Sequence, residues 1–197
     1  SALRRKETFA TSGPRIKVRF FAGYEFDFEM INKQDLVKHL YENGHTMGSE
    51  ILNTEKKGEP TFFLWALQDA DSAPLQRLQI IKGYIEDGEL KEHVFDVICS
   101  DGLEVNQDTS RCPDNGAIVN LNDCSFDTST GASELKTFWQ DPTYVEGQRT
   151  FYYLRVIENP TCRWSTWDAI RNNVEPRSDY PLTIQERAWS SPIHFIP

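Results

Sequence analysis

Residues 75–99 predict two β-strands joined by a tight turn, and this hairpin constrains the fold more than any other feature of the sequence. Leu78 and Ile80 are spaced two residues apart, as in a strand with one buried face. Asp87-Gly88 supplies the positive φ angles that a two-residue hairpin turn needs. Residues 93–99 alternate in the same way and are expected to return as the antiparallel partner. One face of this partner strand carries Val94, Asp96 and Ile98, and the other carries Phe95 and Val97.

Four further segments predict strands. Residues 14–28 alternate apolar and basic side chains, and residues 150–158 are rich in β-branched and aromatic side chains. Residues 61–68 form an almost continuous apolar run, which is typical of a central strand buried on both faces. The last strand is expected within 189–195, where Pro192 lacks a backbone N–H and favours an edge position.

The first helix is expected over residues 33–41, where Leu36, Val37 and Leu40 follow helical spacing. Asn32 is placed to cap its start, and Gly44 to end it.

Two shorter helical segments are expected further along the chain. Residues 134–139 suggest one or two helical turns, and residues 165–172 a short helix with a capping box between Ser165 and Asp168. Strands outnumber these short helices. The expected fold is therefore mainly β, an antiparallel β-sandwich with short helical insertions.

The charge balance excludes some partners. The chain has 197 residues and a formal net charge of −9, which repels nucleic acid and anionic membrane surfaces. Its apolar runs are much shorter than the roughly 18–20 residues of a membrane span. We therefore expect neither a nucleic-acid partner nor a membrane span.

The cysteines suggest an oxidising compartment. They form no C-x-x-C pattern and no His lies close beside them in sequence, which argues against a zinc site. Cys112 and Cys162 lie in turn-like segments, where disulfides are common outside the cytoplasm. Four cysteines allow three pairings, and we favour Cys99–Cys112 with Cys124–Cys162. Such links would staple the long polar loop 100–130, in which one brief strand is expected at 117–119.

Several segments together resemble a known bacterial family. They are ALRRKETFATSGPR at 2–15, LQIIKG at 78–83, FYYLRV at 151–156, RWS at 163–165 and IQERAWSSPI at 184–193. The chain resembles the C-terminal region of the family named domain of unknown function 3604, and residues 2–15 resemble the end of that family's PHP (polymerase and histidinol phosphatase) hydrolase domain.

This resemblance implies a division of the chain. Residues 1–15 would be the remnant of a PHP-like βα barrel, its last helix and strand, and residues 16–197 a C-terminal β-sandwich-like domain. The start Ser1-Ala2-Leu3, without Met, also leads us to expect a chain cut from a longer protein. The barrel would be upstream and would hold divalent metal ions, so we expect no cofactor and no metal ligands in this chain itself. The parent would be a periplasmic or secreted metal-dependent hydrolase of the phosphoesterase kind.

Two groups of residues are candidates for contact with that upstream catalytic domain. The resemblance implies that the chain leaves the barrel near its mouth at Thr11, Ser12, Gly13 and Arg15, where Arg15 could meet an anionic substrate. The second group combines charges with large aromatic rings, which suit packing, ion pairing or a sugar platform. It comprises Arg163, Trp164, Trp167, Glu186, Arg187 and Trp189.

Metal and nucleophile motifs are weak in this sequence. The histidines show no H-x-H or H-E-x-x-H spacing, and the loop carboxylates around Asp101 and Asp123 do not fit the EF-hand pattern. No serine lies in a G-x-S-x-G elbow. The histidines are His39, His45, His93 and His194.

Three functions remain in competition. We expect a non-catalytic accessory domain that packs on the upstream barrel and leaves an apolar patch when alone. The alternative is a free-standing β-sandwich module that binds carbohydrate or protein through exposed Trp or Tyr side chains. An independent enzyme would need a pocket of converging histidines and carboxylates, which the sequence does not supply.

Overall fold

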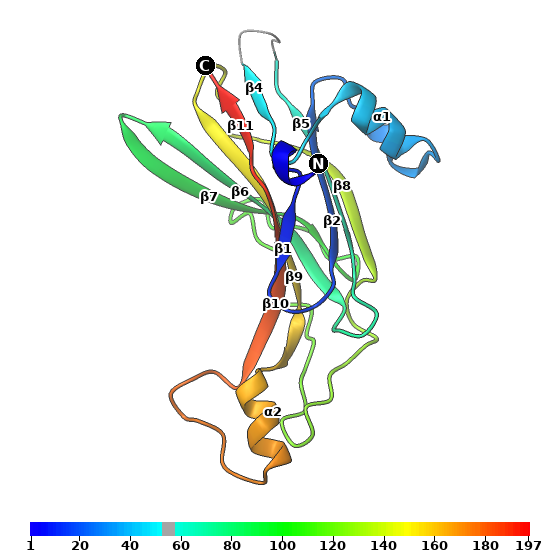
Figure 1. Ribbon diagram of the computed structural model, residues 1–197, viewed down its shortest axis with the longest axis vertical. Coiled ribbons are helices and arrows are strands. Elements are labelled where there is room, and N and C mark those ends of the chain that lie inside the picture. The colour runs from blue at the N-terminus through cyan, green and yellow to red at the C-terminus, as the bar shows by residue number, and fades with distance from the viewer. Residues whose placement is uncertain (53–57) are drawn as a thin grey trace.

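Two β-sheets packed face to face form the body of the molecule (Figure 1). The computed structural model describes residues 1–52 and 58–197. In this described part, sheet A contains β1 (Phe9–Thr11), β4 (Glu50–Leu52), β6 (Leu75–Glu86), β7 (Glu89–Cys99), β9 (Thr150–Cys162), β10 (Thr183–Ser190) and β11 (Ile193–Ile196). Sheet B contains β2 (Lys17–Gly23), β3 (His45–Thr46), β5 (Thr61–Leu67) and β8 (Glu134–Gln140).

The helices are short and lie outside the two sheets. Within residues 1–52 and 58–197, two of them are 3₁₀ turns, η1 and η2, and two are α-helices. In Figure 1, α1 flanks sheet B and α2 lies at the lower end of the molecule. Their bounds are η1 (Leu3–Arg5), η2 (Phe28–Asn32), α1 (Leu36–Asn43) and α2 (Trp164–Arg171).

Strand order explains which segments are neighbours. Sheet A runs β1-β10-β9-β11-β4, and the hairpin β6–β7 joins it because β6 also pairs with β9. Sheet B runs β3-β2-β5-β8. The pairing of β11 with β4 is parallel, and the other pairings of the named strands are antiparallel. The mainly β, sandwich-like fold predicted from the sequence is confirmed.

The predicted central strand is β5, which lies between β2 and β8 and is buried on both faces. Phe62 and Leu64 face sheet A and belong to the main core, whereas Phe63 belongs to a second cluster with Phe21 and Leu40 under α1. This two-sided burial accounts for the continuous apolar run. Burying each of these side chains stabilises the fold by roughly 1.5–3 kcal/mol.

The predicted hairpin is confirmed, but the prediction that Asp96 lies on the same face as Ile98 was wrong. Asp87 and Gly88 form the turn with φ angles of 53° and 81°. Leu78 pairs with Ile98 but Gln79 pairs with Asp96, so Val97 is an extra residue in β7. This bulge breaks the simple alternation and turns Asp96 away from the face that Ile98 occupies.

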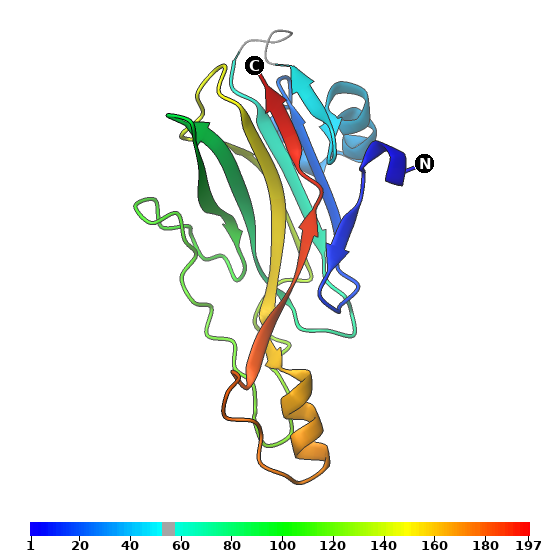
Figure 2. The ribbon, with the colours of Figure 1, turned by 60° about the vertical axis from the view of Figure 1, so that its left-hand side comes forward.

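Two disulfides hold the long loop that follows β7. Cys99 bonds to Cys112 with a Cα–Cα distance of 5.7 Å, and Cys124 bonds to Cys162 at 5.6 Å. The favoured pairing is therefore confirmed. The second bond fastens the loop to the end of β9, beside the start of α2 (Figure 2). The brief strand expected at 117–119 is reduced to one bridging pair, Val119 with Phe126.

Residues 134–139 are a strand, and the prediction of helical turns there was wrong. Strand β8 pairs along its whole length with β5, from Glu134 opposite Leu67 to Gln140 opposite Thr61. Leu135 and Phe138 are buried. The ladder of backbone hydrogen bonds to β5 outweighs the local helix propensity of this segment.

Both predicted helix caps were wrong. Asn32 ends the 3₁₀ turn η2, and α1 begins after Asp35, whose side chain makes no cap hydrogen bond. Helix α2 begins after Arg163, which places Ser165 inside the first turn rather than at the cap. Gly44 does follow the last residue of α1, as expected.

The expected final strand is two strands. Pro192 lies in the bend between β10 and β11, and β11 has neighbours on both sides, β9 and β4. The edge position predicted from Pro192 was therefore wrong, because the proline lies outside either ladder.

Candidate functional site

The turn from β1 to β2 gathers the first group of predicted site residues. Thr11 pairs with Ala188 on β10. The backbone N–H of Ser12 donates to the carbonyl of Arg187 at 3.0 Å, and its hydroxyl donates to the carboxylate of Glu186. The backbone N–H of Arg15 donates to Asp69 at 2.6 Å. Thr11, Ser12, Gly13 and Arg15 thus form a corner fastened to the sandwich, with Gly13 and the Arg15 side chain exposed.

The second group of predicted residues divides into two places. Arg163, Trp164 and Trp167 lie at the start of α2, where the ring of Trp164 is 74% exposed. The guanidinium of Arg171 covers Trp167 at 4.9 Å from the ring centroid. Glu186, Arg187 and Trp189 lie on β10, further up the molecule.

A groove of about 620 Å³ lies between the N-terminal segment and sheet B. Residues 2–9 form one wall, and the other comprises β2, the end of β5 and Tyr41 of α1. Phe20 from the core and Trp65 line it, and Phe9 at its rim is 44% exposed. Phe9 of the edge strand β1 of sheet A and residues 17–21 of β2 of sheet B both line it.

Charged side chains at the rim of this groove form hydrogen bonds and a cation–π contact. Glu7 accepts hydrogen bonds from Arg5 at 2.7 Å and from the hydroxyl of Tyr41 at 2.7 Å. The hydrogen bond from Arg5 lowers the pKa of Glu7, although partial burial opposes this. Arg19 lies over the ring of Trp65, 5.7 Å from its centroid. Sequence reasoning missed this groove, because its walls come from segments far apart in the chain.

The interior holds an ion pair that sequence reasoning also missed. Lys82 Nζ lies 2.6 Å from Asp141 Oδ2 and donates to the carbonyl of Thr143 at 2.7 Å. Tyr152 donates its hydroxyl to Asp141 at 2.7 Å. Burial disfavours the charged carboxylate, but the hydrogen bonds from Lys82, Tyr152 and Thr143 outweigh burial and lower the pKa of Asp141. The signal was a lysine that directly follows the apolar pair Ile80-Ile81 in a predicted strand.

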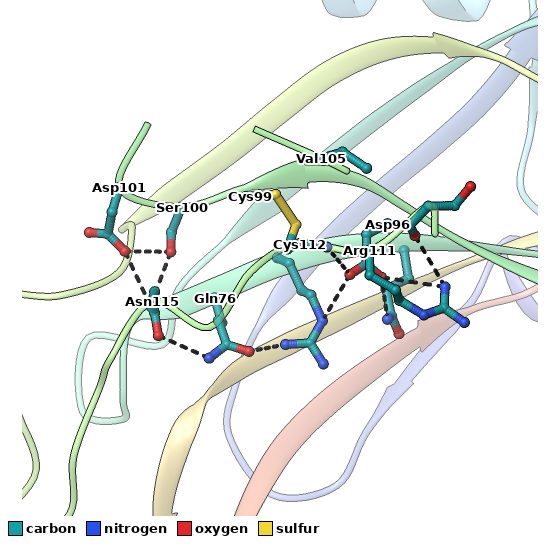
Figure 3. Close-up of a disulfide and its surroundings, with 12 residues drawn as sticks. Gln76, Asp96, Cys99, Ser100, Asp101, Val105, Arg111, Cys112 and Asn115 are labelled. Atoms are coloured by element: carbon teal, nitrogen blue, oxygen red, sulfur yellow. Dashed lines mark hydrogen bonds and ion pairs between the residues drawn. A yellow bond between two sulfur atoms is a disulfide. The ribbon is translucent and has the colours of Figure 1, made fainter. Parts of the chain in front are cut away.

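A second buried carboxylate, Asp96, lies beneath the first disulfide (Figure 3). It accepts hydrogen bonds from the backbone N–H of Cys112 at 2.7 Å and from Gln79 Nε2 at 2.5 Å. Arg77 Nε lies 3.6 Å from it and Arg111 Nη1 4.0 Å. The disulfide partner Cys112 thereby fixes the loop to β7.

A third buried carboxyl group, that of Glu158, has a hydrogen-bond partner among the described residues for one of its two oxygens only. Ser72 donates to its Oε2 at 2.7 Å, while its Oε1 is buried without a hydrogen-bond partner. Burial raises the pKa of Glu158 to about 7, and the charges of Glu186 and Asp69 add to this effect. Glu158 therefore titrates near neutral pH, well above an ordinary glutamate carboxyl.

Within residues 1–52 and 58–197, no group of three or more His, Cys, Asp or Glu side chains is placed to hold a metal ion. His93 stacks on Phe95, with 4.0 Å between ring centroids, and Asp101 accepts the backbone N–H of Gly131 at 2.8 Å. No helix in the same part of the chain is long and apolar enough to cross a membrane.

The sheets, disulfides and surface groove define the class of the protein, a disulfide-linked β-sandwich domain. The chain belongs to the family described as Protein of unknown function (DUF3604), whose model matches residues 1–197. The family predicted from the sequence is therefore confirmed. Among curated proteins and among solved structures, no match to the chain was found.

Proposed function

We propose that this chain is a non-catalytic accessory domain that packs on the metal-dependent, PHP-like hydrolase domain of its own parent protein. The observation that carries the proposal is the groove between residues 2–9 and sheet B. A domain joined ahead of Ser1 would lie directly beside this groove, because residues 2–9 are one of its walls.

Exposed apolar side chains support docking at this place. Leu3 is 82% exposed, Tyr41 50% and Phe9 44%, and all three lie on or beside the groove wall. A docked domain would remove this apolar surface from water, at roughly 25 cal/mol per Å² of buried area. The charged rim of Glu7 and Arg19 supplies polar groups that would orient the partner.

The proposed location is the periplasm or the exterior of the cell. Two disulfides fit a compartment that does not reduce them. Hydrolytic chemistry is assigned to the upstream domain, where divalent metal ions would be bound. The interior polar groups Lys82, Asp141 and Asp96 contribute to folding, because their hydrogen bonds are made within this chain.

The test compares the full-length protein with the 197-residue chain by hydrogen exchange. Docking predicts that amides of residues 2–9 and 17–19 exchange more slowly in the full-length protein. Phe9→Asp should abolish this extra protection, because a carboxylate at the groove rim would be buried unpaired. Ile118→Asp is the matched control, since Ile118 is 75% exposed on the distant loop. Equal exchange of these amides in both proteins would refute docking at the groove.

A further inference from the structure

Sheet A presents arginine side chains on the face away from the core, and Figure 2 looks onto this face. Consecutive side chains of a strand point to opposite faces. The neighbours of three arginines, Leu78, Val156 and Ala188, are fully buried in the core, so these arginines point outward from β6, β9 and β10. A fourth arginine comes from the loop after β7. This set, here called the arginine surface, comprises Arg77, Arg111, Arg155 and Arg187.

The strand register places three of these side chains close together. Arg77 and Arg187 both pair with Ile157, from the strands on either side of β9. Adjacent strands lie about 4.8 Å apart, so the backbones at Arg77 and Arg187 are about 10 Å apart. Arg155 lies two residues further along β9, directly opposite Trp189 on β10. An indole ring therefore shares the outer face with the guanidinium groups.

The first disulfide positions the fourth guanidinium. Arg111 immediately precedes Cys112, whose bond to Cys99 holds the loop against the edge of β7 (Figure 3). Arg111 Nη1 donates to the carbonyl of Val94 and lies 4.0 Å from Asp96. The loop thus brings a cation to the sheet face, where its side chain stays 47% exposed and accessible to a ligand.

The arginine surface is positively charged although the chain as a whole is acidic. Burial lowers the pKa of Arg77, Asp96 opposes that effect, and the charges of Arg155, Arg111 and Arg187 lower the pKa further. Among these groups, one carboxylate faces four guanidiniums, in a chain of formal net charge −9. Crowding like charges costs free energy, which a bound anion would offset.

Many N–H groups of the arginine surface are bound only to neutral oxygens. Arg155 Nε donates to the side-chain oxygen of Gln79 at 2.7 Å, and Arg187 Nε to the carbonyl of Gln185 at 3.4 Å. Within the described residues, Arg77 Nε has no hydrogen-bond partner, although Asp96 Oδ2 lies 3.6 Å from it. A guanidinium carries five N–H donors, so donors remain for a ligand with several oxygens.

These features define the chemistry of a ligand. Guanidinium groups bind carboxylate, sulfate and phosphate oxygens in pairs, and an indole ring stacks on the apolar face of a sugar ring. Arg155 and Trp189 offer both contacts side by side. We propose that the arginine surface binds a carboxylated or sulfated oligosaccharide, with its acidic groups on Arg155 and Arg187 and a sugar ring on Trp189.

An acidic sugar chain fits better than a nucleic acid. Duplex DNA carries one charge per roughly 1.7 Å of axis, so it meets the repulsion of the whole acidic protein over a long contact. A short oligosaccharide carries fewer charges than duplex DNA and contacts only the arginine surface. The two disulfides also fit an environment in which polysaccharides are present.

The test is calorimetric titration of the 197-residue chain with defined oligosaccharides. The probes are hexagalacturonate, its neutral methyl ester, a chondroitin sulfate hexasaccharide and its desulfated form, with oligo-dT as the nucleic-acid probe. We expect at least one acidic sugar to bind and its neutral counterpart to bind at least tenfold more weakly. Arg187→Glu and the milder Arg155→Gln should each raise the Kd about tenfold, the size of a lost charged hydrogen bond.

Lys33→Glu is the matched control, because Lys33 is exposed on the far side near α1 and undergoes the same charge change as Arg187→Glu. It should change the Kd less than twofold. Equal binding of acidic and neutral sugars, tighter binding of oligo-dT, or no binding of any acidic sugar would overturn the proposal. Hydrogen exchange at residues 2–9 of the Arg187→Glu full-length protein should stay unchanged, so this test and the docking test fail independently.

Discussion

Lys82 and Asp141 form an ion pair inside the sandwich, with 2.6 Å between Nζ and Oδ2 and side-chain exposures of 2% and 0%. Lys82 comes from β6 and Asp141 from the residue after β8, so the pair joins the two sheets. Thr143 and Tyr152 donate further hydrogen bonds to the Asp141 carboxylate, and Lys82 donates another to the carbonyl of Thr143. A buried pair with such partners is costly to break from one side, because the remaining charge stays in the interior.

Lys82→Met should therefore lower the free energy of unfolding by about 3–5 kcal/mol. The substitution leaves Asp141 buried without its cation. Urea denaturation followed by tryptophan fluorescence measures the change. The double variant Lys82→Met/Asp141→Leu should recover most of the loss, because the buried charge is then removed as well.

Lys91→Met is the control for this prediction. Lys91 pairs with Glu86 on the same hairpin, but the two side chains are 41% and 49% exposed. An exposed pair contributes about 0–1 kcal/mol, so this variant should stay close to the parent. If Lys82→Met and Lys91→Met had equal effects, the structural role given to the buried pair would be wrong.

The sequence predicted those parts of the fold that have a local cause. The turn Asp87-Gly88, the apolar run of β5 and the aromatic strand β9 each carry their own signal, and all three were found. The favoured disulfide pairing was also confirmed, although the sequence allows three pairings and carries no local signal that selects one.

The parts that were missed depend on partners distant in the chain. Residues 134–139 form β8 only because β5, about 70 residues earlier, offers a ladder. Lys82 is tolerated in the core because Asp141, which comes 59 residues later in the sequence (141 − 82), lies 2.6 Å from it in space. The groove and the arginine surface each combine several strands, so no window of sequence contains them.

Glu158 should make the stability of the protein depend on pH. Its pKa in the folded state is about 7, above the ordinary value of 4.5, because burial disfavours the charged form. The stabilisation that comes from the proton on Glu158 is thus complete below pH 4.5, and it is lost as the pH rises to about 7. The free energy of unfolding should fall by up to about 3 kcal/mol across this window from this group.

Glu158→Gln should remove that component of the pH dependence. The neutral amide has no charge to bury, so the variant should be more stable than the parent at pH 8 and similar at pH 4.5. Thermal unfolding across pH 4–8 measures this difference. Glu134→Gln, at an exposed position, should leave the pH profile of the parent unchanged. A Glu158→Gln profile with the parent's slope would falsify the assignment.

The two disulfides should contribute unequally to stability. In the chain-entropy model, the Cys124–Cys162 link with a separation of 38 residues is worth about 4 kcal/mol, and the Cys99–Cys112 link with a separation of 13 about 3 kcal/mol. Paired Cys→Ser variants and chemical denaturation test this order. Thiol alkylation followed by mass measurement should give no label before reduction and four labels after it. Labelling without reduction would contradict both bonds.

Gly83 should be intolerant of even a methyl group. It pairs with Phe151 on β9, and a Cβ at Gly83 would lie 2.1 Å from the Phe151 ring. Gly83→Ala must displace that ring and should cost about 1–3 kcal/mol, measured by urea denaturation.

The companion variants separate this clash from a general effect of replacing glycine. Gly13→Ala should be nearly neutral, because the closest atom to a Cβ there lies 4.0 Å away. Phe151→Val removes the ring, so adding Gly83→Ala to that variant should cost less than in the parent. If Gly83→Ala costs the same with or without the Phe151 ring, contact between the two positions is not the cause, and backbone freedom at Gly83 must be responsible instead.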